Sequence, residues 1–75
     1  MHTYDVWPRT DGHCVDLISD QLPFGKLSYE GPRAVVNAIQ YALQRSQSHD
    51  AVIRVYDAAG NLIGTHEHKG DFRES

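Results

Sequence analysis

Only one segment of the chain has the apolar spacing of a helix, which limits the fold to a single helix combined with strands. The segment runs from about Pro32 to Gln47, with Gly31 as the N-cap; Pro32 suits the first helical position because its missing N–H would be unpaired there. Polar side chains such as Gln40 and Gln44 lie on the opposite side and should face solvent. The apolar stripe that should face the core consists of Val35, Ala38, Ile39, Ala42 and Leu43.

The residues after this helix predict a hairpin whose register can be read. Segment 57–61 (Asp-Ala-Ala-Gly-Asn) is typical of a three-residue loop with Gly60 in the left-handed conformation. Pairing Asp57 with Asn61 then assigns the cross-strand partners to two faces. The uncharged set, which should pack under the helix, is Val55 with Ile63 and Ile53 with Thr65. The set expected on the open face is Tyr56 with Leu62, Arg54 with Gly64 and Val52 with His66.

A second hairpin is predicted near the start of the chain, where segments 4–7 and 13–18 flank an Asp-Gly turn at 11–12. A two-residue loop gives one apolar side, with Val6 opposite Leu17 and Pro8 opposite Val15. The same register gives a mixed side, with Trp7 opposite Asp16 and Asp5 opposite Ile18. The alternative three-residue loop would place Trp7 opposite Val15, and such a slip exchanges the two faces completely.

The element order β-β-α-β-β predicts one α+β domain over residues 1–75, with a four-stranded, mainly antiparallel sheet and one helix packed on one face. We expect the strand order second-first-third-fourth with every pair antiparallel, because the sequential order would pair the second and third strands in parallel. Residues 69–75 should form a frayed tail. A helix about 10 Å across cannot cover four strands, so the second face should stay open. The link at 19–30 should close one end of the core with Leu22, Phe24, Leu27 and Tyr29.

Size, charge and cysteine content exclude several classes of protein. The chain has 75 residues, enough for one small domain, and its net charge of −3 does not favour nucleic-acid or membrane partners. No more than three apolar residues are consecutive, so no membrane span is predicted, and the first residues lack the pattern of a signal peptide. Cys14 is the single cysteine, which excludes an internal disulfide and makes the cytoplasm the expected location.

Five histidines raise the question of a metal site. His66 and His68 are two apart on a predicted strand, so they share a face with side chains about 7 Å apart. Such a pair could share a Zn²⁺ or Ni²⁺ ion, but a closed site needs four ligands, and the others would have to come from Cys14, Asp16 or His2. The spacing matches no known metal motif, and two solvated histidines on a polar strand are the simpler interpretation.

Residue types used in catalysis are present, but not in a catalytic arrangement. Ser48, His49 and Asp50 are consecutive, whereas a hydrolytic triad needs side chains that converge from different parts of a fold. His13 and Cys14 are adjacent on a strand and should point to opposite faces, which argues against an activated thiol. One helix and 75 residues leave little room for a catalytic pocket. Enzymatic activity is therefore not expected.

The open face of the sheet carries the strongest functional pattern. Aromatic and aliphatic groups alternate there with Asp5 and Asp16, which is typical of a protein interface, and the basic residues are too scattered to bind phosphates. The simpler alternative is an ordinary amphipathic face. The sequence favours a small non-enzymatic module that self-associates as a homodimer or binds a protein partner, with divalent-metal binding through His66 and His68 as the alternative. The interface candidates are Trp7, Ile18, Val52, Arg54, Tyr56 and Leu62.

Segments 11–15 (Asp-Gly-His-Cys-Val), 49–57 (His-Asp-Ala-Val-Ile-Arg-Val-Tyr-Asp), 60–61 (Gly-Asn) and 66–72 (His-Glu-His-Lys-Gly-Asp-Phe) carry a resemblance across most of the chain. The chain resembles a group of short uncharacterised bacterial proteins that form a family of unknown function. The resemblance implies a compact bacterial cytoplasmic domain. It supplies no catalytic or binding residue.

Overall fold

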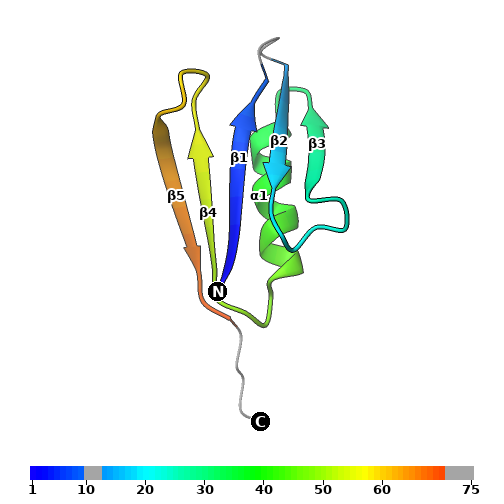
Figure 1. The fold of residues 1–75 in the computed structure, drawn as a ribbon, viewed down its shortest axis with the longest axis vertical. Helices are drawn as coiled ribbons and strands as arrows, with labels where there is room; N and C mark the ends of the chain where they lie inside the picture. The colour runs from blue at the N-terminus through cyan, green and yellow to red at the C-terminus, as the bar shows by residue number, and fades with distance from the viewer. Residues whose placement is uncertain (10–12, 71–75) are drawn as a thin grey trace.

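The computed structural model describes residues 1–9 and 13–70, which form a two-layer α+β domain (Figure 1). Its five strands form one mixed sheet in the order β3-β2-β1-β4-β5, and α1 packs on one face. None of the described residues belongs to a helix long and apolar enough to cross a membrane. The elements are β1 (His2–Pro8), β2 (Cys14–Ile18), β3 (Lys26–Glu30), α1 (Ala34–Arg45), β4 (Ala51–Tyr56) and β5 (Leu62–His68).

The predicted four-stranded sheet is wrong by one strand, because part of the expected link forms β3. Lys26–Glu30 pairs antiparallel with β2, with Leu17 opposite Leu27. The order of the other four strands is the predicted one, but β1 and β4 are parallel. The two differences have one cause, because the extra strand reverses the chain once more before α1. The strand after the helix therefore runs in the direction of β1.

The β1–β2 hairpin has the predicted two-residue register, with Val6 opposite Leu17 and Trp7 opposite Asp16. Val6, Val15 and Leu17 are buried on the face that carries α1, which we call the helix-side face. The Asp-Gly turn predicted at 11–12 lies outside the described residues.

The β4–β5 hairpin follows its predicted register only at the turn. Gly60 has φ +89° and donates its N–H to the Asp57 carbonyl oxygen (3.0 Å), as expected for a type I turn that ends in the left-handed conformation. Tyr56 lies opposite Leu62, but Val55 lies opposite Gly64, so Ile63 has no partner and forms a β-bulge. From there on the predicted partners are wrong by one residue, which exchanges the two faces of β5.

The helix is shorter than predicted, and its buried stripe is rotated. α1 begins at Ala34 after Arg33 rather than at Pro32 after Gly31, and no side chain caps it. Val35, expected in the core, is 38% exposed. The buried residues of α1 are Ala34, Ala38 and Ala42, with Ile39, Tyr41 and Leu43 packed partly against the core. Alanines at a spacing of four residues allow the helix backbone to lie close to the sheet.

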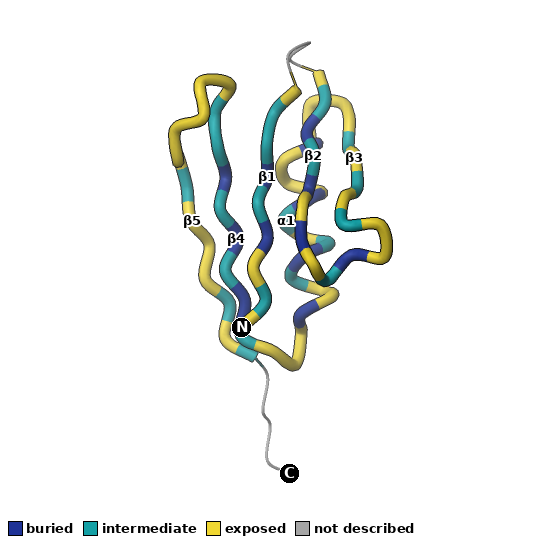
Figure 2. The backbone as a smooth tube through the Cα atoms, in the orientation of Figure 1, coloured by how far each residue is buried: buried dark blue, intermediate teal, exposed yellow. Residues whose placement is uncertain are grey.

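The helix packs more against β2 and β3 than against β1 and β4, and β5 extends beyond it (Figure 1). The tube coloured by burial shows the result, since buried residues recur along β1, β2 and β4 but are absent from β5 (Figure 2). In the segment before β3, Leu22 is buried as predicted, whereas Phe24 is 91% exposed and does not close the core. Of the tail expected at 69–75, only residues 69 and 70 are described, and the Gly70 N–H is held by the Asp50 carboxylate (2.9 Å).

Candidate functional site

The sheet face opposite α1, which we call the open face, brings together all six residues that the sequence predicts for an interface. Residues directly opposite one another in neighbouring strands point to the same face, as do residues two apart along a strand. The helix lies behind the sheet in the view of Figure 1, so the open face is turned toward the reader. The register places on this face Trp7, Ile18, Val52, Arg54, Tyr56 and Leu62.

Two aromatic rings form the centre of the open face. Trp7 of β1 and Tyr56 of β4 are stacked with ring centroids 3.9 Å apart and ring planes within 1° of parallel. Each ring therefore covers one face of the other. Aromatic pairs of this kind add about 0.5–1.5 kcal/mol beyond the burial of their area. The stack holds β1 and β4 together on the side of the sheet that α1 does not reach.

An ion pair lies in the next row of the open face. The Arg54 Nε donates to Asp5 Oδ1 at 2.8 Å, again across the β1–β4 contact. Both side chains are partly exposed, so the pair contributes little free energy and mainly fixes the two charges in place. A hollow of about 260 Å³ lies beside this pair, bordered by Ile18 and by Ser19, Asp20 and Gly25 of the loop after β2.

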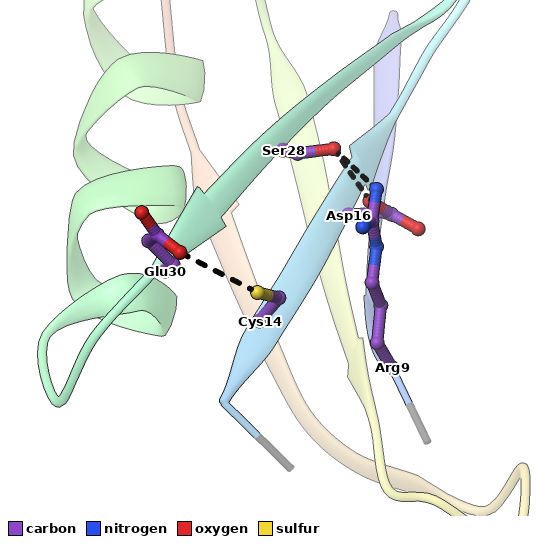
Figure 3. Close-up of polar contacts among 5 residues, drawn as sticks. All are labelled: Arg9, Cys14, Asp16, Ser28 and Glu30. Carbon is purple, nitrogen blue, oxygen red and sulfur yellow. Dashed lines mark hydrogen bonds and ion pairs between the residues drawn. The ribbon is translucent and has the colours of Figure 1, made fainter. Parts of the chain in front are cut away.

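A second polar cluster covers the β2–β3 side of the open face (Figure 3). The Arg9 guanidinium contacts Asp16 Oδ1 at 3.0 Å and donates to Ser28 Oγ at 2.8 Å. Ser28 in turn donates to the same Asp16 oxygen at 2.9 Å. Burial by itself would raise the pKa of Asp16, but the hydrogen bonds from Arg9 and Ser28 outweigh it, and the pKa lies below its usual value. Asp16 is thus held as a carboxylate with its charge compensated.

The Cys14 thiol lies beside a carboxylate. Its Sγ is 3.9 Å from Glu30 Oε2 on the neighbouring strand (Figure 3). Reactive cysteines need electropositive surroundings that stabilise the thiolate. The placement of Glu30 gives Cys14 the opposite kind of neighbour.

His66 and His68 share a face as predicted, but the predicted face is wrong. They lie opposite Ile53 and Ala51 and therefore on the helix-side face, not beside Arg54. The bulge at Ile63 causes this exchange. Within residues 1–9 and 13–70, no three His, Cys, Asp or Glu side chains form a group suited to a metal ion. Cys14 and Asp16, considered as further ligands, lie on the other face of the sheet.

The structure brings together a polar group that the sequence does not indicate. The buried Ser46, directly after α1, lies 2.6 Å from both His2 Nδ1 and the Tyr4 hydroxyl, and the His49 ring lies 4.6 Å from that of His2. With His2 neutral and its Nδ1 unprotonated, Tyr4 donates to Ser46 and Ser46 donates to His2. Burial of the ring lowers the pKa of His2, and the positive charges of His49, the chain's amino group and Arg45 lower it further.

Two of the missed features left a signal in the sequence and one did not. An isolated glycine in a strand pattern, here Gly64, suggests a bulge, and the alternation of Leu27 and Tyr29 with polar residues suggests a strand. The contact of Ser46 with His2 and Tyr4 joins residues more than 40 positions apart, and no local pattern indicates it.

The similarity to short bacterial proteins stays a prediction. Comparison with models of protein families, with curated proteins and with solved structures gives no match for this chain.

Proposed function

We propose that this protein is a non-enzymatic interaction module that binds a protein surface across its open face. The observation that carries the proposal is the Trp7–Tyr56 stack, a rigid aromatic centre on a sheet face that lies away from the only helix among the described residues. Aromatic side chains are enriched at the centres of protein interfaces because they bury a large area and lose little conformational freedom. Leu62 adds aliphatic area beside Tyr56, and Ile18 and Val52 add more farther along the same face.

The arrangement of charges favours a protein partner over a nucleic acid. The two arginines described on the open face, Arg9 and Arg54, are both bound to carboxylates, and the chain as a whole carries a net charge of −3. A nucleic-acid surface needs cations directed toward phosphates and ring faces on which bases stack. Here the facing surfaces of Trp7 and Tyr56 cover each other.

The charge pairing also makes the open face compatible with a second copy of itself. Asp5 and Asp16 are each paired with an arginine of the same chain, so these two carboxylates do not oppose the approach of a second open face. A second copy is therefore the first partner to test. The hollow beside Arg54 gives the partner a place for one side chain.

The single tryptophan makes the open face directly observable, because Trp7 is the only source of tryptophan fluorescence. We expect the mass measured by sedimentation to rise with concentration, with a blue shift of the Trp7 emission and weaker quenching by acrylamide. Val52→Lys, on the open face, should weaken the association. Gln40→Lys, on the exposed side of α1, adds the same charge and should leave it unchanged. An associated state in which Trp7 is quenched as readily as in the monomer would contradict self-association through the open face, as would a monomer at every concentration.

A further inference from the structure

The two edges of the sheet differ in how well they are protected. β3 has five residues with Lys26 and Glu30 at its ends, and its Leu27 and Tyr29 pack against the core. β5 has seven residues, none of them buried, and among residues 1–9 and 13–70 its one neighbouring strand is β4. An edge strand presents unpaired N–H and C=O groups that a further strand can bind. The edge at β5 is the longer and the more exposed of the two.

The sequence of β5 carries few of the features that prevent strand addition. Proline and lysine within the strand, or several charges, normally protect an edge. From Leu62 to His68 there is no proline or lysine, and Glu67 is the single acidic residue. Leu62 is 53% exposed and Ile63 is 64% exposed. The bulge at Ile63 lies near the turn, so Gly64–His68 keeps a regular register.

The strand is compatible with a second copy of itself. An antiparallel pair of β5 strands centred on Thr65, the middle residue, joins the regular residues Gly64 to His66 of the two copies and places the bulged Ile63 opposite Glu67. Thr65 then lies opposite Thr65 of the second copy, a favourable cross-strand pair, and His66 lies opposite Gly64, which has no side chain. Centring the pair on Glu67 would instead oppose two carboxylates.

We infer that two copies of this protein join edge to edge through β5, antiparallel and centred on Thr65, so that the two sheets become one continuous sheet. The two-fold axis of such a pair is perpendicular to the sheet. Both helices therefore lie on one side, and the two open faces form a single surface on the other. This second interface uses a different part of the molecule from the open face and does not require the open face to be occupied.

A charge exchange at the centre of the pair tests the inference. Thr65 is exposed, and its side chain would face its own copy about 5 Å away across the two-fold axis. Thr65→Lys and Thr65→Glu should each weaken the dimer about tenfold or more at pH 8 and low salt, as measured by sedimentation. An equimolar mixture of the two variants should recover dimerisation as a heterodimer. Thr3→Lys, an exposed site on the same face but in the interior strand β1, is the matched control and should leave the dimer intact.

The outcomes separate this inference from the open-face proposal. Loss of the dimer in Thr65→Lys and its recovery in the mixture would establish the β5 contact, whatever Val52→Lys does. Loss of association in Val52→Lys with no effect of Thr65→Lys would overturn the β5 contact and leave the open face as the interface. A parent protein that stays monomeric, or a mixture that recovers nothing, would also overturn it.

Discussion

Strands β2 and β5 belong to one sheet, yet β2 buries a row of side chains and β5 buries none. The difference lies in what covers them. α1 packs against β1, β2, β3 and β4 and helps to bury Val6, Val15 and Leu17, whereas the helix-side face of β5 carries Gly64, His66 and His68. Alternation along a strand therefore assigns the faces of its side chains, whereas their burial depends on how far the covering helix extends across the sheet.

The largest expected difference comes from one substitution made in both regions. Leu17→Ala removes a fully buried side chain under α1 and should lower the free energy of unfolding by about 2–5 kcal/mol through lost burial and a cavity. Leu62→Ala in β5 should change it by less than about 0.5 kcal/mol. Urea unfolding followed by circular dichroism measures both. Similar losses would mean that β5 is covered after all.

The second prediction concerns the end of α1. Ser46→Ala leaves the buried Tyr4 hydroxyl without its hydrogen bond and should cost about 1–3 kcal/mol. Ser48→Ala, two residues later and exposed, should have almost no effect. The same urea unfolding curves decide the matter, and a neutral Ser46→Ala would show that this contact does not help to hold β1 under the helix.

A smaller effect is expected on the open face, outside the cover of α1. The coupling between Asp5 and Arg54 should be about 0.2–1 kcal/mol because both side chains are partly exposed. A double-mutant cycle with Asp5→Asn and Arg54→Gln isolates this term, and it should shrink as salt is added. A coupling energy as large as the loss in Leu17→Ala would mean that the open face, and not the core under α1, contributes most to holding β4 in the sheet.

The smallest effect is a dependence on pH. The pKa of His2 is lowered in the folded state. As the pH falls below about 6.5, His2 is therefore protonated in the unfolded state before it is protonated in the folded state. Stability should therefore fall below that pH and level off below the pKa of the folded state. Unfolding at pH 8 and pH 5 should show a smaller loss for His2→Gln than for the parent. His66→Gln, in the uncovered strand β5, serves as the control. A loss of stability between pH 8 and pH 5 that is as large in His2→Gln as in the parent would contradict the assignment of the pH dependence to His2.

Local chemistry explains which parts of the fold could be predicted. The Asp-Gly signal correctly indicates the β1–β2 register, and Gly60 correctly indicates the β4–β5 turn, because both depend on neighbouring residues. The strand β3 was missed because its five residues alternate only briefly between apolar and polar side chains. This single omission also made the predicted direction of β4 wrong.

In the candidate site, too, only the features that depend on neighbouring residues could be predicted. The six candidate interface residues lie on one face as predicted, because Tyr56 and Leu62 precede the bulge and the others lie in strands whose faces were assigned correctly. His66 lies beyond the bulge, and one unpaired residue moves it to the other face. In the helix, Val35 fits the apolar spacing as well as Ala34 does. Only close packing against the sheet selects the small side chain for burial.

The parallel pairing of β1 with β4 also affects how the chain folds. The two hairpins and the helix each form from residues close in sequence, but His2 meets Ala51 only after most of the chain has been brought together. The entropy lost in closing such a loop must be spent before the contact contributes any stability, and chains rich in distant contacts fold slowly for this reason. We therefore expect the docking of the β4–β5 hairpin onto β1 to be the slow step of folding. In the monomer, the amides of β5 should then exchange with solvent more readily than those of β1, through local openings that leave the rest of the domain folded.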